Sequence, residues 1–152
     1  VIRTLIGIHV QKDVFVKDET NQTYWSDWKH QDGGKLYLIN IDWTKIDNEN
    51  KVNVQIYDDN FDCIVKERQL LEIAYQKGSV VYSHHNDVDI CALGNDKYSL
   101  CGFGEFDLVL RSKRDSIVLL NGTEIAKIED GEKIAKISLQ GQAELKFMEK
   151  IS

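Results

Sequence analysis

The chain lacks the features that mark several large classes of protein. None of its apolar runs approaches the roughly 20 residues that a membrane-spanning helix needs. Its 19 basic residues are interleaved with 25 acidic ones, and the formal net charge is −6. A surface that binds phosphates gathers lysine and arginine on one side. We therefore expect neither a membrane span nor a nucleic-acid partner.

Sequence motifs of common enzymes are also missing. The chain contains no G-x-S-x-G nucleophile motif, no phosphate-binding P-loop and no dinucleotide-binding glycine pattern. Gly102 and Gly104 form a Gly-x-Gly, but no helix is predicted after them to support a phosphate. Glu105 and Asp107 share one face of a predicted strand, yet paired surface carboxylates are far commoner than catalytic ones. We predict a non-catalytic chain.

The chain has three cysteines, an odd number without the paired C-x-x-C spacing of a zinc site. Cys63, Cys91 and Cys101 each lie in or beside a strand-like run. With 152 residues the chain is long enough for one domain with a hydrophobic core and does not need disulfides. We interpret the three as reduced, structural residues. The start at Val1 is typical of a fragment or module of a larger protein.

Short strands separated by turn residues make up most of the sequence. Leu145 and Phe147 alternate with polar residues, and this period of two is typical of a strand. Asn121-Gly122 lies between two apolar runs and predicts a type I′ hairpin turn. Glu129-Asp130-Gly131 and Gln140-Gly141-Gln142 predict two further reversals. We expect an antiparallel meander in the C-terminal third.

The fold class follows from the spacing of the turns. Turn signals recur about every eight to twelve residues, as in sandwiches and barrels. We predict an all-β fold, an antiparallel β-sandwich or jelly roll of roughly ten to thirteen strands. One segment departs from this pattern: good helix formers predict a short helix from Glu67 to Gln76, ending near Gly78.

The predicted core consists of apolar residues that share one face of a strand. Trp43, which follows an apolar run, is also expected inside. The other inward-facing residues are Ile6, Ile8, Val54, Ile56, Leu108, Leu110, Ile117, Leu119, Leu145 and Phe147.

Aromatic residues in a polar stretch form the candidate ligand site. Tyr24, Trp25 and Trp28 lie among polar residues, where their rings either anchor the segment onto the core or form a binding platform. Flat rings stack on the apolar faces of sugars, and Asp27 and His30 could hydrogen-bond hydroxyl groups. The sequence leaves both interpretations open, and a concave site of this kind suits a small ligand.

Two polar clusters are candidate metal sites. Oxygen ligands crowded into Asp58, Asp59, Asn60 and Asp62 would suit Ca²⁺, the one ion that this cluster suggests, although the EF-hand spacing is absent. The alternative is a turn, because Asp and Asn bond nearby backbone amides.

The second cluster contains His84, His85, Asp87 and Asp89, which offer nitrogen and oxygen ligands in a short span. If the segment is a strand, the two histidines point to opposite faces and cannot bind one metal. The alternative is a solvated loop.

The run DSIVLLNGTEIAKIEDGEKIAKISL resembles the ends of β-sandwich accessory domains that are attached to polysaccharide-degrading enzymes. The resemblance transfers no site residue. The leading hypothesis is a non-catalytic binding or accessory module with a carbohydrate or protein partner. The alternatives are a structural or assembly domain of a phage, viral or cell-surface protein, and a metal-assisted enzyme using the cluster from His84 to Asp89. The compartment stays open, with an extracellular or cell-surface location favoured.

Overall fold

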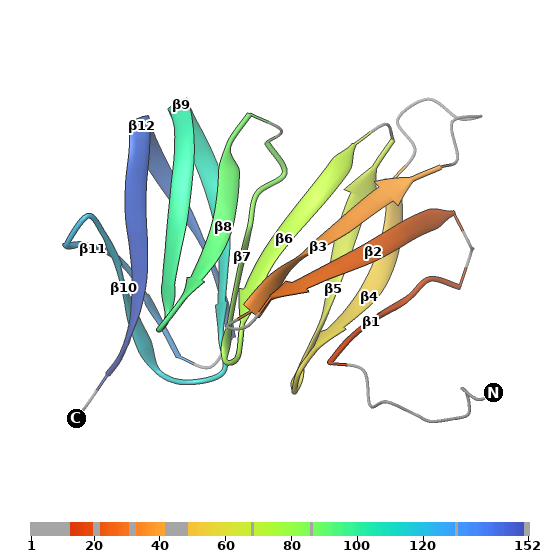
Figure 1. Cartoon of the computed structure of the whole chain (residues 1–152), viewed down its shortest axis with the longest axis horizontal. Coiled ribbons are helices and arrows are strands. Elements are labelled where there is room, and N and C mark those ends of the chain that lie inside the picture. The colour runs from red at the N-terminus through yellow and green to blue at the C-terminus, as the bar shows by residue number, and fades with distance from the viewer. Residues whose placement is uncertain are drawn as a thin grey trace.

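The protein is an antiparallel β-sandwich, as the sequence predicts (Figure 1). The computed structural model describes residues 13–19, 22–30, 33–41, 49–67, 69–85, 87–129 and 131–150. This part of the chain contains strands and no helix. The strands are β1 (Val14–Lys17), β2 (Thr23–His30), β3 (Gly33–Asn40), β4 (Glu49–Ile56), β5 (Asp59–Lys66), β6 (Leu70–Gln76), β7 (Ser79–Tyr82), β8 (Asp89–Gly94), β9 (Lys97–Ser112), β10 (Ser116–Leu120), β11 (Thr123–Ile128) and β12 (Gly131–Glu149).

The described strands form two sheets. The smaller has the order β1-β4-β5, and the larger has the order β11-β10-β12-β9-β7-β6-β3-β2, with β8 paired to β9. β8 and β7 both pair with β9, but β8 pairs with its first half and β7 with its last residues. The larger sheet is therefore bent over so that its two parts face each other.

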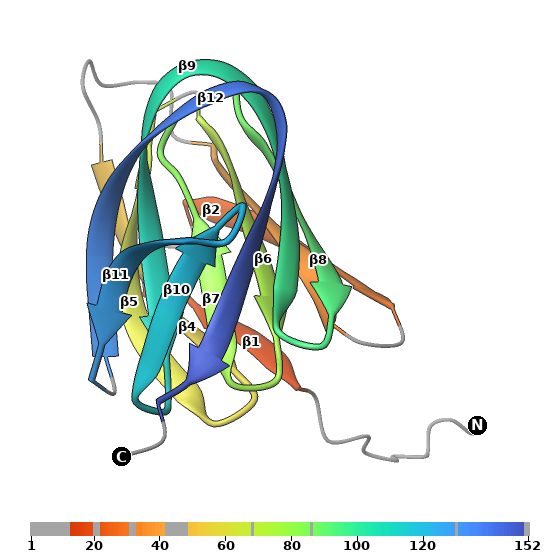
Figure 2. The same ribbon diagram turned by 90° about the vertical axis from the view of Figure 1, so that its left-hand side faces the viewer.

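The bend lies in the long antiparallel pair of β9 and β12, which arches over the top of the molecule (Figure 2). Midway along the two strands, the register places Gly102 opposite Gly141. Gly104 and Gly141 have φ angles of 111° and 116°, a conformation that side chains with a Cβ rarely adopt. The glycines allow both strands to turn sharply while their pairing continues.

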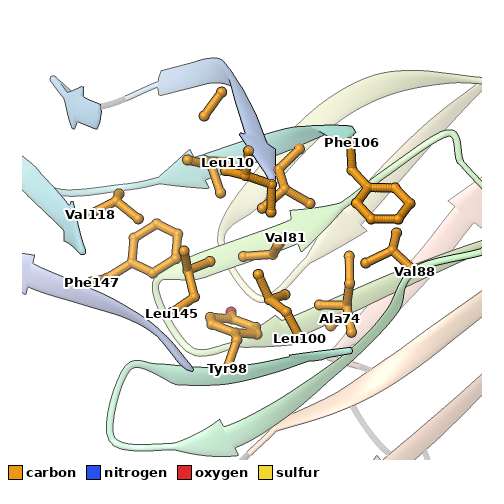
Figure 3. Close-up of a cluster of buried hydrophobic side chains, with 14 of the residues drawn as sticks. Ala74, Val81, Val88, Tyr98, Leu100, Phe106, Leu110, Val118, Leu145 and Phe147 are labelled. Carbon is orange, nitrogen blue, oxygen red and sulfur yellow. The ribbon is translucent and has the colours of Figure 1, made fainter. Parts of the chain in front are cut away.

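The bend creates an inner core between the two parts of the folded sheet (Figure 3). Tyr98 and Leu100 from the first half of β9 meet Leu108 and Leu110 from its second half, and all four are fully buried. Phe147 joins them from β12, with its ring 5.7 Å from that of Tyr98. One strand thus contributes to both walls of the same core.

An outer core lies between the three-stranded sheet and the back of the larger sheet. Val54 and Ile56 of β4 pack there with Leu36 of β3. β7 is buried on both faces, since Val80 belongs to the outer core and Val81 to the inner core. A strand in this middle position is mostly apolar, and in β7 the one polar residue, Ser79, is hydrogen-bonded to the Tyr98 hydroxyl at 2.7 Å.

A buried ion pair links the three-stranded sheet to the larger one. Arg111 of β9 donates to both carboxylate oxygens of Asp59 on β5, at 3.0 and 2.9 Å. It also donates to Glu132 of β12 at 2.9 Å and lies 4.3 Å from the centre of the Phe61 ring. Two-point bonding of this kind fixes the orientation of a guanidinium group.

Three sequence expectations for turns and strands have different outcomes. Asn121-Gly122 forms the predicted hairpin turn, with φ angles of 49° and 85°. The predicted reversal at Gln140-Gly141-Gln142 is wrong, because β12 runs without interruption through the bend. The predicted reversal at Glu129-Asp130-Gly131 includes Asp130, which lies outside the described residues; the flanking strands β11 and β12 are not neighbours in the sheet, since β10 lies between them. The C-terminal third is therefore not a simple meander.

The predicted helix from Glu67 to Gln76 is wrong, because Leu70–Gln76 forms strand β6. β6 pairs with β3 on one side and with β7 on the other. Leu71, Ile73 and Tyr75 follow a period of two and are buried in the outer core. Burial on both faces and pairing on both edges outweigh the helix propensity of the segment.

Six of the predicted core residues are buried: Val54, Ile56, Leu108, Leu110, Leu145 and Phe147. Ile117 and Leu119 are half-exposed instead, and Val118 between them is fully buried. The prediction assigned the wrong face of β10 to the interior, because only the face with Val118 lies against the inner core. Ile6, Ile8 and Trp43 lie outside the described residues.

Substitution of a bend glycine should weaken the fold through the backbone alone. A Cβ at Gly104 would meet no atom within 4 Å, but its φ of 111° disfavours alanine. We expect Gly104→Ala to lower the free energy of unfolding by about 1–2 kcal/mol. Gly131→Ala is the control, because a Cβ there makes only an ordinary contact and its φ is not in the left-handed region. Equal urea midpoints for the two variants would contradict this role of the bend.

Candidate functional site

The alternation of β2 divides the predicted ligand residues between two faces. Tyr24, Trp28 and His30 point to one side and are exposed, with Tyr24 and Trp28 at 68% and 67%. Tyr24 and Trp28 are four positions apart, which corresponds to about 13 Å along a strand. Trp25 and Asp27 point to the opposite side.

Residues of β3 extend the exposed side of β2 across the sheet. The register places Ile39 opposite Tyr24, Tyr37 opposite Ser26 and Lys35 opposite Trp28. Directly opposed residues share a face in an antiparallel pair. On β6 the same face continues through Leu70 and Glu72. We call this surface the aromatic face; it consists of Tyr24, Ser26, Trp28, His30, Lys35, Tyr37, Ile39, Leu70 and Glu72.

Lys35 is the central charge of the aromatic face. Its Nζ donates to Glu72 at 3.0 Å and to Asp89 of β8 at 3.1 Å, and it lies 5.9 Å from the centre of the Tyr37 ring. Burial lowers the pKa of Lys35, but the hydrogen bonds to Asp89 and Glu72 outweigh it, so the pKa lies above its ordinary value. The face therefore combines rings with a fixed cation and two carboxylates.

The opposite side of β2 is structural. Trp25 packs against the outer core, with its ring 6.1 Å from that of Phe15. Asp27 accepts a hydrogen bond from the hydroxyl of the buried Tyr75 at 2.5 Å. The same hydroxyl leaves no room for a side chain at position 34 of β3, since a Cβ on Gly34 would lie 2.5 Å from it. The two tryptophans do not form one platform.

Several residues of the aromatic face were not predicted. Lys35, Tyr37 and Ile39 alternate with Leu36 and Leu38, so a period of two was visible in this run. However, Tyr37 and Ile39 are themselves largely apolar, so the sequence does not show that these odd-numbered residues face outward. The proximity of Asp89 depends on the folding of the larger sheet and has no local signal.

The structure separates the residues of the cluster from His84 to Asp89. The His84 ring packs edge-on against Tyr82 at 5.7 Å, whereas the His85 ring packs against Phe106 at 5.8 Å. Asp89 pairs with Lys35, and Asp87 is exposed. Among the described residues, no group of three His, Cys, Asp or Glu side chains is placed to hold a metal ion.

The acidic group on β5 is likewise divided. Asp59 is buried and bound to Arg111, while Asp58 is exposed in the β4–β5 turn. Asn60 and Asp62 lie on the other face of β5, where both accept hydrogen bonds from Asn53, at 2.6 and 3.0 Å. The four residues do not surround a common point.

The three cysteines are not joined by a disulfide. Cys63 is buried in the outer core, where burial raises the pKa of its thiol to about 12. Cys91 and Cys101 are half-buried on the paired strands β8 and β9.

Comparisons with known proteins give no relative: no family model, curated protein or solved structure matches the chain. In the portion of the chain that the structure covers, no helix is long and apolar enough to cross a membrane.

His84 should make stability depend on pH. Its Nδ1 is buried without a hydrogen-bond partner among the described residues. Burial, and then the nearby Lys66, lower the pKa of His84 below its ordinary value. The unfolded chain binds this proton below about pH 6.5, so the contribution of His84 to stability is present above that pH and is lost as the pH falls.

We expect His84→Phe, which keeps a ring beside Tyr82, to reduce the fall in urea midpoint between pH 7.5 and pH 5. Parallel pH profiles for the wild type and the variant would show that His84 does not carry the effect.

Proposed function

We propose that the chain is a non-catalytic binding module that recognises carbohydrate through the aromatic face. The observation that carries the proposal is the pair Tyr24 and Trp28, which expose about two thirds of their surface on one side of a hydrogen-bonded strand. Exposed rings on a regular strand are held at a fixed spacing and need little ordering when a ligand binds.

The surroundings of the rings suit a sugar chain. Tyr37 lies on the neighbouring strand, opposite Ser26 and between the positions of the two exposed rings. Lys35 and Glu72 supply a donor and an acceptor for hydroxyl groups beside them. Because the rings of Tyr24 and Trp28 are about 13 Å apart along the strand, an oligosaccharide rather than a single sugar would contact both.

The difference between the two tryptophans also favours binding at Trp28. Trp25 is half-buried and packs against Phe15 and the outer core, as expected for a residue that anchors the strand. Trp28 is 67% exposed, so core packing does not account for its size. A large exposed aromatic residue of this kind is typical of a recognition surface.

Truncation of Trp28 should remove binding and leave the fold intact. We expect Trp28→Ala to weaken binding of the best ligand from a panel of soluble polysaccharides at least tenfold, because loss of an aromatic hot spot costs on the order of 2 kcal/mol. Titration calorimetry measures the affinity, and thermal unfolding checks the fold.

Two variants serve as controls. Phe103→Ala removes another exposed aromatic ring, 74% exposed near the bend, and should leave binding unchanged. Trp25→Ala should instead destabilise the fold by about 2 kcal/mol, since it removes partly buried packing. Binding that survives Trp28→Ala, or a panel without any ligand, would refute carbohydrate recognition by this face.

A structural or assembly role is the second candidate, and the sheet edges favour it. Among the described strands, five pair with one neighbour only: β1, β2, β5, β8 and β11. An unpaired strand edge offers backbone groups to another chain. Light scattering distinguishes the candidates, because assembly through an edge gives a defined oligomer whose mass is independent of added glycan.

A further inference from the structure

A separate cleft lies where three turns of the chain meet. It has a volume of about 760 Å³ and is lined by the β4–β5 turn, the β6–β7 turn and the segment between β9 and β10. This volume falls within the range of small-molecule sites, about 300–1,000 Å³. Its lining includes Tyr57, Asp58, Lys77, Lys113 and Arg114.

Backbone contacts hold two of these turns together. The amide of Lys113 donates to the carbonyl of Gly78 at 3.1 Å. A Cβ at Gly78 would lie 3.6 Å from Nη2 of Arg114, so the guanidinium group passes close to this turn. The positions of Lys77 and Lys113 along the cleft are thereby fixed by the fold.

The charges of the cleft are only partly compensated. Arg114 forms ion pairs with Asp96 and Glu149, both at 3.6 Å. Lys77 and Lys113, in contrast, have no ion-pair partner among the residues that the structure describes. A pair of free ammonium groups in one concavity is notable in a chain with a net charge of −6.

The acidic residues of the cleft do not neutralise these lysines. Asp13 pairs with Lys29, whose Nζ lies 5.6 Å from the centre of the Tyr57 ring. Asp58 is exposed in the β4–β5 turn and makes no ion pair within the described structure. It is the one carboxylate of the cleft that would oppose an anionic ligand.

The backbone at Tyr57 provides an independent indication of a site. Its φ is 54°, in the left-handed region where a large side chain is strained. Asparagine or glycine is usual at this position of a tight hairpin. The conformation keeps the Tyr57 ring beside the Tyr75 ring, 6.0 Å away, and on the wall of the cleft. Strained residues of this kind gather at ligand sites.

We infer that this cleft binds a small organic anion, with Lys77 and Lys113 as the groups that hold its carboxylate or sulfate. Tyr57 and Gln55 supply hydrogen-bonding groups on the same wall. The inference is independent of the proposed function, because none of these residues belongs to the aromatic face.

The test is a chemical-shift titration of the amide-labelled protein with citrate and, separately, with sodium sulfate, using glycerol as the neutral control. We expect citrate or sulfate, but not glycerol, to shift the amides of Tyr57, Lys77, Gly78 and Lys113. The double variant Lys77→Gln/Lys113→Gln should bind about tenfold more weakly, and added NaCl should weaken wild-type binding. The response to citrate against sulfate distinguishes a carboxylate site from a sulfate site.

Two further variants complete the experiment, a matched control and a variant that should increase the affinity. Lys133→Gln/Lys136→Gln removes the same charge from exposed residues of β12 and should leave the affinity unchanged. Asp58→Asn should increase the affinity about twofold, since it removes the opposing charge. The inference is overturned if neither anion shifts these amides, if both double variants weaken binding equally, or if Asp58→Asn weakens it.

Discussion

The sharp bend in the paired strands β9 and β12 is the constraint on which the rest of the structure depends. Without it, the apolar face of the larger sheet that forms the inner core would be exposed. With it, the two halves of β9 face each other and bury Tyr98 and Leu100 against Leu108 and Leu110. Gly104 and Gly141 allow the turn because their backbone angles are accessible mainly to glycine. The bend also brings β8 over the far end of the sheet, where Asp89 reaches Lys35 on the aromatic face.

The arrangement of the sheets in layers determines which side chains are buried in the cores and which are exposed to a ligand. In the middle of the molecule, β7 and the second half of β6 are buried on both faces, so their side chains pack in the two cores. β2 lies at the end of the sheet, where one face meets the outer core through Trp25 and the other carries Trp28. Position in the sheet thus separates a structural tryptophan from an exposed one, three residues apart in the chain.

Local patterns were enough to predict the all-β class and the Asn121-Gly122 turn, and six of the eight predicted core residues that the structure describes are buried. They failed where distant segments determine the outcome. The sequence of β6 predicts a helix, but the segment is a strand because β3 and β7 pair with its two edges. Gly141 predicts a reversal, but β12 continues through it because β9 pairs with it along the whole bend. Within the candidate site, the aromatic residues of β2 were identified, but the odd spacing of Trp25 and Trp28 should have placed them on opposite faces. The cleft lined by Lys77 and Lys113 is formed by turns far apart in the sequence, so no local sequence pattern predicts it.

The central proposal is that the aromatic face recognises carbohydrate. Its most direct test is a map of amide and indole chemical shifts in the presence of neutral and acidic oligosaccharides. The account predicts that the Trp28 indole and the amides of Tyr24, Ser26 and Tyr37 shift together, while the signals of Trp25 and Phe103 stay in place. Shifts confined to the bend or to the outer core, or no shift with any oligosaccharide, would contradict it.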